Sequence, residues 1–101
     1  MHLVQLLLPV YDNAGSAFPE ENYSNVRGEL TDKFGGLTAF TRAPAQGLWR
    51  NEGETTHDDI VVFEVMTADL DHQWWSRYRS ALEELFRQEH IVIRAQPVVL
   101  L

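Results

Sequence analysis

The sequence predicts a single α+β domain, spanning residues 1–101, in which a four-stranded antiparallel sheet carries two helices on one face. Two observations support this prediction. Apolar residues alternate with period two in segments 2–10, 37–41, 60–67 and 91–96, and they recur at helical spacing in segments 20–34 and 72–89. The chain order is therefore β-α-β-β-α-β, and 101 residues are enough for one domain of this kind.

The predicted strands are apolar on both faces. In segment 2–10, Leu3 and Leu7 alternate with Val4 and Leu6, and Gln5 stands among them. In segment 60–67, Val62 and its neighbours alternate with Val61, Phe63 and Val65 in the same way. Pro97 follows segment 91–96 and indicates an edge or a break in the last strand.

The first predicted helix spans residues 20–34 and is bounded by recognisable signals. Ser16 is a candidate cap, Gly28 is a weak helix former that would allow close approach to the sheet, and Gly35 favours a left-handed stop. Its predicted buried stripe contains Tyr23, Val26, Leu30 and Phe34.

The second predicted helix spans residues 72–89, and either Asp69 or Asp71 can cap it. Its predicted buried stripe contains Trp75, Tyr78, Leu82, Leu85 and Phe86. The order of all these elements is that of the ferredoxin-like fold, whose helices cover only one face of the sheet.

The composition excludes several functions. Fifteen acidic against eight basic residues give a formal charge of −7, which disfavours binding to nucleic acid and to anionic membranes. The chain has no cysteine, so disulfides, thiolate nucleophiles and cysteine metal sites are excluded. Segment 3–10 lacks the basic flank and cleavage site of a secretory signal, so we expect a soluble cytoplasmic protein.

An apolar sheet face without helices predicts a homodimer, because such a patch exceeds what a monomer normally exposes. Two such sheets would pack face to face, as in a dimeric α/β barrel. The alternative is that the C-terminal residues or the long connection after residue 42 fold over this face.

Gln5, Glu64 and Arg94 are lone polar residues within apolar strands, and the expected strand order places them in a row across the sheet. They either bind a small ligand, with Glu64 as acid or base, or form a satisfied Glu–Arg pair that fixes register at the dimer interface. The need to pair buried charges favours the second interpretation.

Two further groups of residues are candidates for a site. The acidic segment 52–59 contains His57, which would be a catalytic base near a pocket, but its spacing matches no metal motif and we expect no metal. Phe40, Trp49 and Trp74, with Trp75 and Tyr78, either line an apolar ligand pocket or belong to the core. We expect a core role for most of them.

No serine–histidine–acid order, P-loop or dinucleotide fingerprint occurs, and we expect no cofactor. The favoured hypothesis is a homodimer that binds a small apolar or aromatic molecule through Trp49, Trp74, Phe40, Arg94 and Gln5. The alternative is a small enzyme with His57, Glu64, Arg42 and Tyr78 as its acid–base or substrate-contacting groups.

The segment from Phe34 to Thr38, followed by Gly47-Leu48-Trp49 and Glu54, resembles a group of small bacterial proteins of unknown function. In that group a helix runs into a Gly-Leu-Thr strand and then a Gly-x-Trp turn. At the level of fold, the chain also resembles the dimeric α/β-barrel proteins, which include cofactor-independent monooxygenases, muconolactone-isomerase-like enzymes and ligand-binding modules. That resemblance implies a dimer but carries no function by itself.

Overall fold

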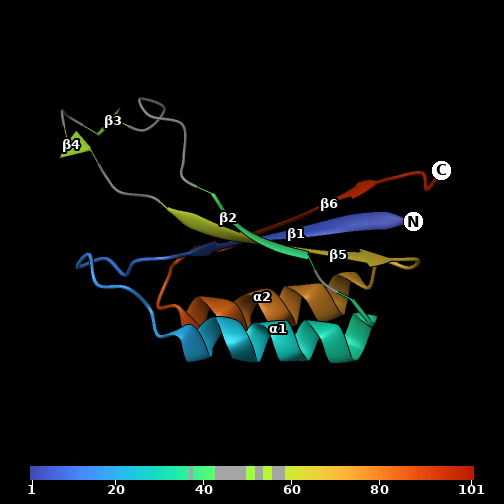
Figure 1. The fold of residues 1–101 in the computed structure, drawn as a ribbon, viewed down its shortest axis with the longest axis horizontal. Coiled ribbons are helices and arrows are strands. Elements are labelled where there is room, and N and C mark those ends of the chain that lie inside the picture. The colour runs from blue at the N-terminus through green and yellow to red at the C-terminus, as the bar shows by residue number, and fades with distance from the viewer. Residues whose placement is uncertain (37, 43–49, 52–53, 56–58) are drawn as a thin grey trace.

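The two helices lie together on one face of the sheet, and no described helix covers the other face (Figure 1). The computed structural model describes residues 1–36, 38–42, 50–51, 54–55 and 59–101, and it describes side chains for residues 1–36 and 59–101. The element order is β-α-β-β-α-β with a small additional pair of strands after β2. The predicted α+β fold, with two helices packed on an antiparallel sheet, is confirmed.

The sheet has the order β2-β5-β1-β6, from β2 (Thr38–Arg42) through β5 (Ile60–Thr67) and β1 (His2–Pro9) to β6 (Val92–Pro97). Every neighbouring pair is antiparallel. β1 is central, with Gln5 opposite Glu64 on one side and Arg94 on the other. A separate pair joins β3 (Arg50–Asn51) to β4 (Glu54–Thr55).

Helix α1 (Glu20–Phe34) has the bounds that its sequence predicts. It begins after Pro19 and has no side-chain cap, so the prediction that Ser16 caps it is wrong. It ends as predicted at Gly35, whose φ of 80° lets its N–H reach the carbonyl of Thr31. Gly28 is exposed with open space around it, so it does not serve close packing against the sheet.

Helix α2 (His72–Leu85) begins at Asp71, whose carboxylate accepts a hydrogen bond from the Trp74 N–H. It ends four residues before the predicted residue 89. Arg87 has a φ of 50°, and its N–H bonds back to the carbonyl of Glu84, which closes the helix with a left-handed turn. This turn leaves Leu85 39% exposed, so the prediction that Leu85 is buried is wrong.

The core lies between the helices and the inner face of the sheet. Val4, Leu6 and Leu8 of β1 pack against Phe63 and Val65 of β5 and against both helices. The helices contribute the following buried side chains: Tyr23, Val26, Leu30, Trp75, Tyr78 and Leu82. Phe86 follows α2 directly and is also fully buried, in edge-on contact with Phe18.

The opposite side of the sheet, here called the open face, is also apolar. Strand alternation places these residues on it: Leu3, Leu7, Ile60, Val62, Met66 and Val92. Met66 and Val92 are about half exposed, at 49% and 51%. Val99, Leu100 and Leu101 are themselves exposed, so the C-terminal residues do not cover this face. The connection after residue 42 lies largely outside the described residues.

Candidate functional site

The three lone polar residues of the open face form one hydrogen-bonded row, here called the polar row. The Gln5 amide nitrogen donates to a Glu64 carboxylate oxygen at 2.6 Å, and the Arg94 Nε donates to the Gln5 amide oxygen at 2.8 Å. The side-chain amide of Gln5 has an NH2 group that donates and an oxygen that accepts, so it binds the acidic Glu64 and the basic Arg94 at the same time. The predicted alignment across the sheet is therefore present.

The predicted direct pairing of Glu64 with Arg94 is absent among the described side chains. The reason is the strand order. β5 and β6 lie on opposite sides of β1, so the two charged residues are about 10 Å apart, twice the usual strand spacing. Gln5 fills the gap between them and joins them indirectly.

A cleft of about 780 Å3, here called the end cleft, lies at the edge of the sheet where β1 ends and where β5 and β6 begin. Its floor contains four residues that point to the open-face side: Leu7, Pro9, Ile60 and Val92. One wall is the loop after β1, including Tyr11, Asp12 and Asn13. The remaining walls come from Asp59 and from Gln88, His90 and Ile91.

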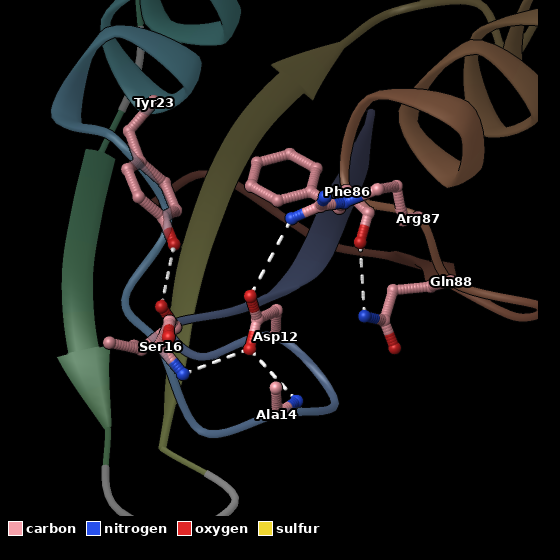
Figure 2. Close-up of polar contacts among 8 residues, drawn as sticks. Asp12, Ala14, Ser16, Tyr23, Phe86, Arg87 and Gln88 are labelled. Carbon is pink, nitrogen blue, oxygen red and sulfur yellow. Dashed lines mark hydrogen bonds and ion pairs between the residues drawn. The ribbon is translucent and has the colours of Figure 1, made fainter.

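The loop wall of the end cleft is fixed by Asp12. One oxygen of its carboxylate accepts hydrogen bonds from the N–H groups of Ala14 and Ser16, both at 2.9 Å. The other oxygen lies 3.6 Å from the Arg87 guanidinium (Figure 2). Asp12 therefore joins the β1–α1 loop to the turn after α2, which lie on either side of the cleft.

Tyr23 anchors the same loop from α1, because its hydroxyl donates a hydrogen bond to the carbonyl of Pro9 (Figure 2). Burial, with a smaller effect of the Glu20 charge, raises the pKa of Tyr23 to about 12. The phenol is therefore a neutral donor at physiological pH. Tyr23 thus holds the loop against α1 and does not line the end cleft.

A second hollow of about 410 Å3 lies between α2 and the edge strand β6. Arg94 is on its rim, with Arg79 and His72 from α2, and Trp75 forms part of its wall. Arg94 thus belongs to the polar row and also borders this hollow. Gln5 and Trp74, the other described candidates for ligand binding, line neither hollow.

The aromatic residues of α2 pack against each other and against α1. Phe34 stacks on Trp75 with ring centres 5.3 Å apart, and Trp74 stacks on Tyr78 at 4.8 Å. The Lys33 ammonium lies 4.7 Å above the Trp74 ring. These contacts place Trp74 in a packed cluster on the helix side, as in the core interpretation.

Tyr78 shares this cluster, and its buried hydroxyl has no hydrogen-bond partner among the described residues. Burial, with a smaller contribution from the Glu29 charge, raises the pKa of Tyr78 far above its ordinary value. Such a phenol stays protonated near neutral pH, which makes it a poor general base.

The structure describes no side chains for the remaining candidate residues. The backbones of Phe40 and Arg42 belong to β2, opposite Val62 and Ile60. Trp49 and His57 lie outside the described residues altogether, as does most of the acidic segment 52–59.

Within the described part of the chain, no three histidine or acidic residues are placed to hold a metal ion. Neither described helix has the length and apolar character required to span a bilayer.

Comparison with known proteins identifies the fold. No family model and no curated protein sequence matches the chain, so the resemblance to the Gly-Leu-Thr group finds no support. Among solved structures, a phage SAM lyase in complex with S-methyl-5'-thioadenosine matches with a TM-score of 0.62 and 12% identity, over 94% of this chain and 79% of that chain.

Two other solved structures are similar. CutA1 from Pyrococcus horikoshii matches with a TM-score of 0.58 and 16% identity, over 97% of this chain and 83% of that chain. The PII-like protein CutA from Nostoc sp. PCC 7120, in its apo form, matches with a TM-score of 0.56 and 14% identity, over 97% and 81%. At these identities the likeness concerns the fold alone, and the chain is a small ferredoxin-like α+β domain.

Proposed function

We propose that this chain is a small-molecule-binding domain that acts as a homodimer, with a second copy packed on the open face. The observation that carries the proposal is the polar row, which crosses an apolar sheet face that no described helix covers. An unlike pair of charges at the two ends of such a row makes this face self-complementary, because in a two-fold interface each charge can meet its opposite on the other copy.

The order of charges selects one orientation for the second copy. In face-to-face packing, a two-fold axis that runs along β1 between the two sheets brings Glu64 of each copy over Arg94 of the other. An axis that runs across the strands would instead bring Glu64 over Glu64 and Arg94 over Arg94. Unlike charges attract and like charges repel, so the first arrangement is favoured.

Burial of the open face supplies the driving force. Removing apolar surface from water is worth about 25 cal/mol per Å2, and a stable interface commonly buries about 800 Å2 on each partner. Two sheets packed in this way lie about 10 Å apart, which is the geometry of a dimeric α/β barrel.

The end cleft is the proposed ligand site. Its apolar floor fits a small apolar or aromatic molecule, and the acidic residues Asp12 and Asp59 in its walls disfavour an anion. A phage SAM lyase of the same fold is bound to S-methyl-5'-thioadenosine, which is an uncharged molecule with an aromatic base. This nucleoside is therefore the first compound to test.

The enzyme alternative has less support. Of the groups that it names, Glu64 and Tyr78 line neither the end cleft nor the hollow beside α2. Arg42 and His57 remain predictions of that alternative.

Charge reversal tests the dimer. In Glu64→Arg both ends of the row are positive, so the two interfacial pairs become repulsive and sedimentation should show a monomer. Arg94→Glu should do the same. The double variant Glu64→Arg/Arg94→Glu restores unlike pairs, and it should sediment as a dimer like the parent chain.

A parent chain that sediments as a monomer at 100 μM would refute the proposed homodimer. Equal dimerisation by the parent chain and both single variants would refute the proposed orientation. For the ligand, isothermal titration with S-methyl-5'-thioadenosine should give saturable binding that is lost in Asn13→Trp, which narrows the end cleft. Heat signals that are the same in Asn13→Trp would place the ligand elsewhere.

A further inference from the structure

We propose that the end cleft is one half of a binding site, which a second copy of this chain completes. This inference rests on the proposed homodimer and adds to it: the two clefts of a dimer face each other, and the ligand is held between the subunits. The ligand would be an uncharged or positively charged ring compound.

The end cleft adjoins the surface that the second copy would cover. Leu7, Ile60 and Val92 belong both to the cleft floor and to the open face. A second copy that covers the open face must therefore also cover this floor. The cleft is open to solvent in the single chain, so this cover would turn a surface hollow into an enclosed site.

The orientation that the polar row favours also brings the two end clefts together. A two-fold axis along β1 leaves the direction of the strands unchanged, so the Leu7 end of one copy lies over the Leu7 end of the other. The two end clefts then meet at the same end of the dimer. With an axis across the strands, the Leu7 end would lie over the opposite end of the second copy, and the clefts would be far apart.

The charged groups around the end cleft select the class of ligand. The titratable residues that line the cleft are Tyr11, Asp12, Asp59 and His90, and Arg87 lies beside Asp12 at 3.6 Å. Two copies would contribute four carboxylates around an apolar floor. The field of these groups disfavours anions and favours hydrogen-bond donors or a cationic group attached to an apolar ring.

The test uses tryptamine as a probe and indole-3-propionate as its matched control, because the two share a ring and differ in the sign of their charge. Titration calorimetry is performed on the parent chain, on Arg94→Glu and on Glu64→Arg/Arg94→Glu. Neither substituted residue lines the end cleft. We expect tryptamine to bind the two dimeric proteins at least tenfold more tightly than the monomeric Arg94→Glu.

Saturating tryptamine should also lower the dimer dissociation constant of the parent chain at least tenfold, because a ligand that prefers the dimer must stabilise it to the same extent. Indole-3-propionate should bind at least tenfold more weakly than tryptamine. Equal tryptamine affinity in a monomeric Arg94→Glu and in a dimeric parent would overturn the shared site and leave the homodimer standing, whereas an Arg94→Glu that dimerises like the parent would overturn the orientation on which the shared site rests. Tighter binding of indole-3-propionate would overturn the ligand class, and a monomeric parent chain would overturn the homodimer together with this inference.

Discussion

Asp12 should contribute to stability as a hydrogen-bond acceptor more than as a charge. Its carboxylate accepts two loop N–H groups at 2.9 Å and lies 3.6 Å from the Arg87 guanidinium, which is largely exposed. Each hydrogen bond contributes about 0.5–1.5 kcal/mol, whereas an exposed ion pair contributes about 0.2–1 kcal/mol. We therefore expect Asp12→Ala to lower the free energy of unfolding by about 1–4 kcal/mol.

Two matched variants separate these contributions. Asp12→Asn keeps the oxygen that accepts from Ala14 and Ser16, and Arg87→Gln removes only the charge on the other side. Each should lower the free energy of unfolding by about 1 kcal/mol or less. Urea denaturation at one fixed protein concentration measures all three, with slopes of about 1–3 kcal/mol per M for a domain of this size. The reasoning would be refuted if Asp12→Asn were as unstable as Asp12→Ala.

Two further predictions concern Tyr23 and the glycines within and directly after α1. The pKa of Tyr23 is raised to about 12 from its ordinary value of 10, so its stabilisation is fully present below pH 10 and is lost as the pH rises through 12. Urea titrations between pH 9 and 11.5 should show a shallower decline for Tyr23→Phe than for the parent chain, and identical declines would contradict this. Gly28→Ala should raise the melting temperature, because Gly28 is exposed within a helix and has open space around it, with a gain of up to about 1 kcal/mol. Gly35→Ala should lower the melting temperature, because Gly35 has a φ of 80°, and the loss of stability should be similar to or larger than the gain from Gly28→Ala. Shifts of the melting temperature with the same sign in both variants would be inconsistent with these backbone effects.

The hydrophobic pattern predicts the body of each element better than its ends. Helix α1 and strand β5 have the predicted bounds, because Pro19, Gly35 and Asp59 mark them in the sequence. The end of α2 was missed because no glycine or proline marks it. Arg87 takes up the left-handed conformation there, a state that an L-residue adopts only when its surroundings hold it.

The sequence likewise predicts some parts of the candidate site and not others. The polar row was predictable, because three lone polar residues in apolar strands align once the strand order is known. The bridging role of Gln5 was not foreseen, since it depends on which strand is central. Asp12 was missed as a cleft residue, although the Asp-Asn-Ala-Gly-Ser sequence after β1 is typical of a loop in which an aspartate accepts from N–H groups nearby.

The polar row also accounts for the register of an edge strand that the core holds only loosely. Apart from Ile93, the residues of β6 are exposed, so hydrophobic burial specifies its position weakly. A slip of one residue would turn Arg94 toward the helix side, where Ile93 now packs against the core, and would take its guanidinium away from Gln5. Partial burial of a guanidinium without a partner costs free energy, so this arginine disfavours the wrong register. The same residue that fixes β6 within the sheet thus sets the charge pattern by which, in the proposed dimer, the second copy is oriented.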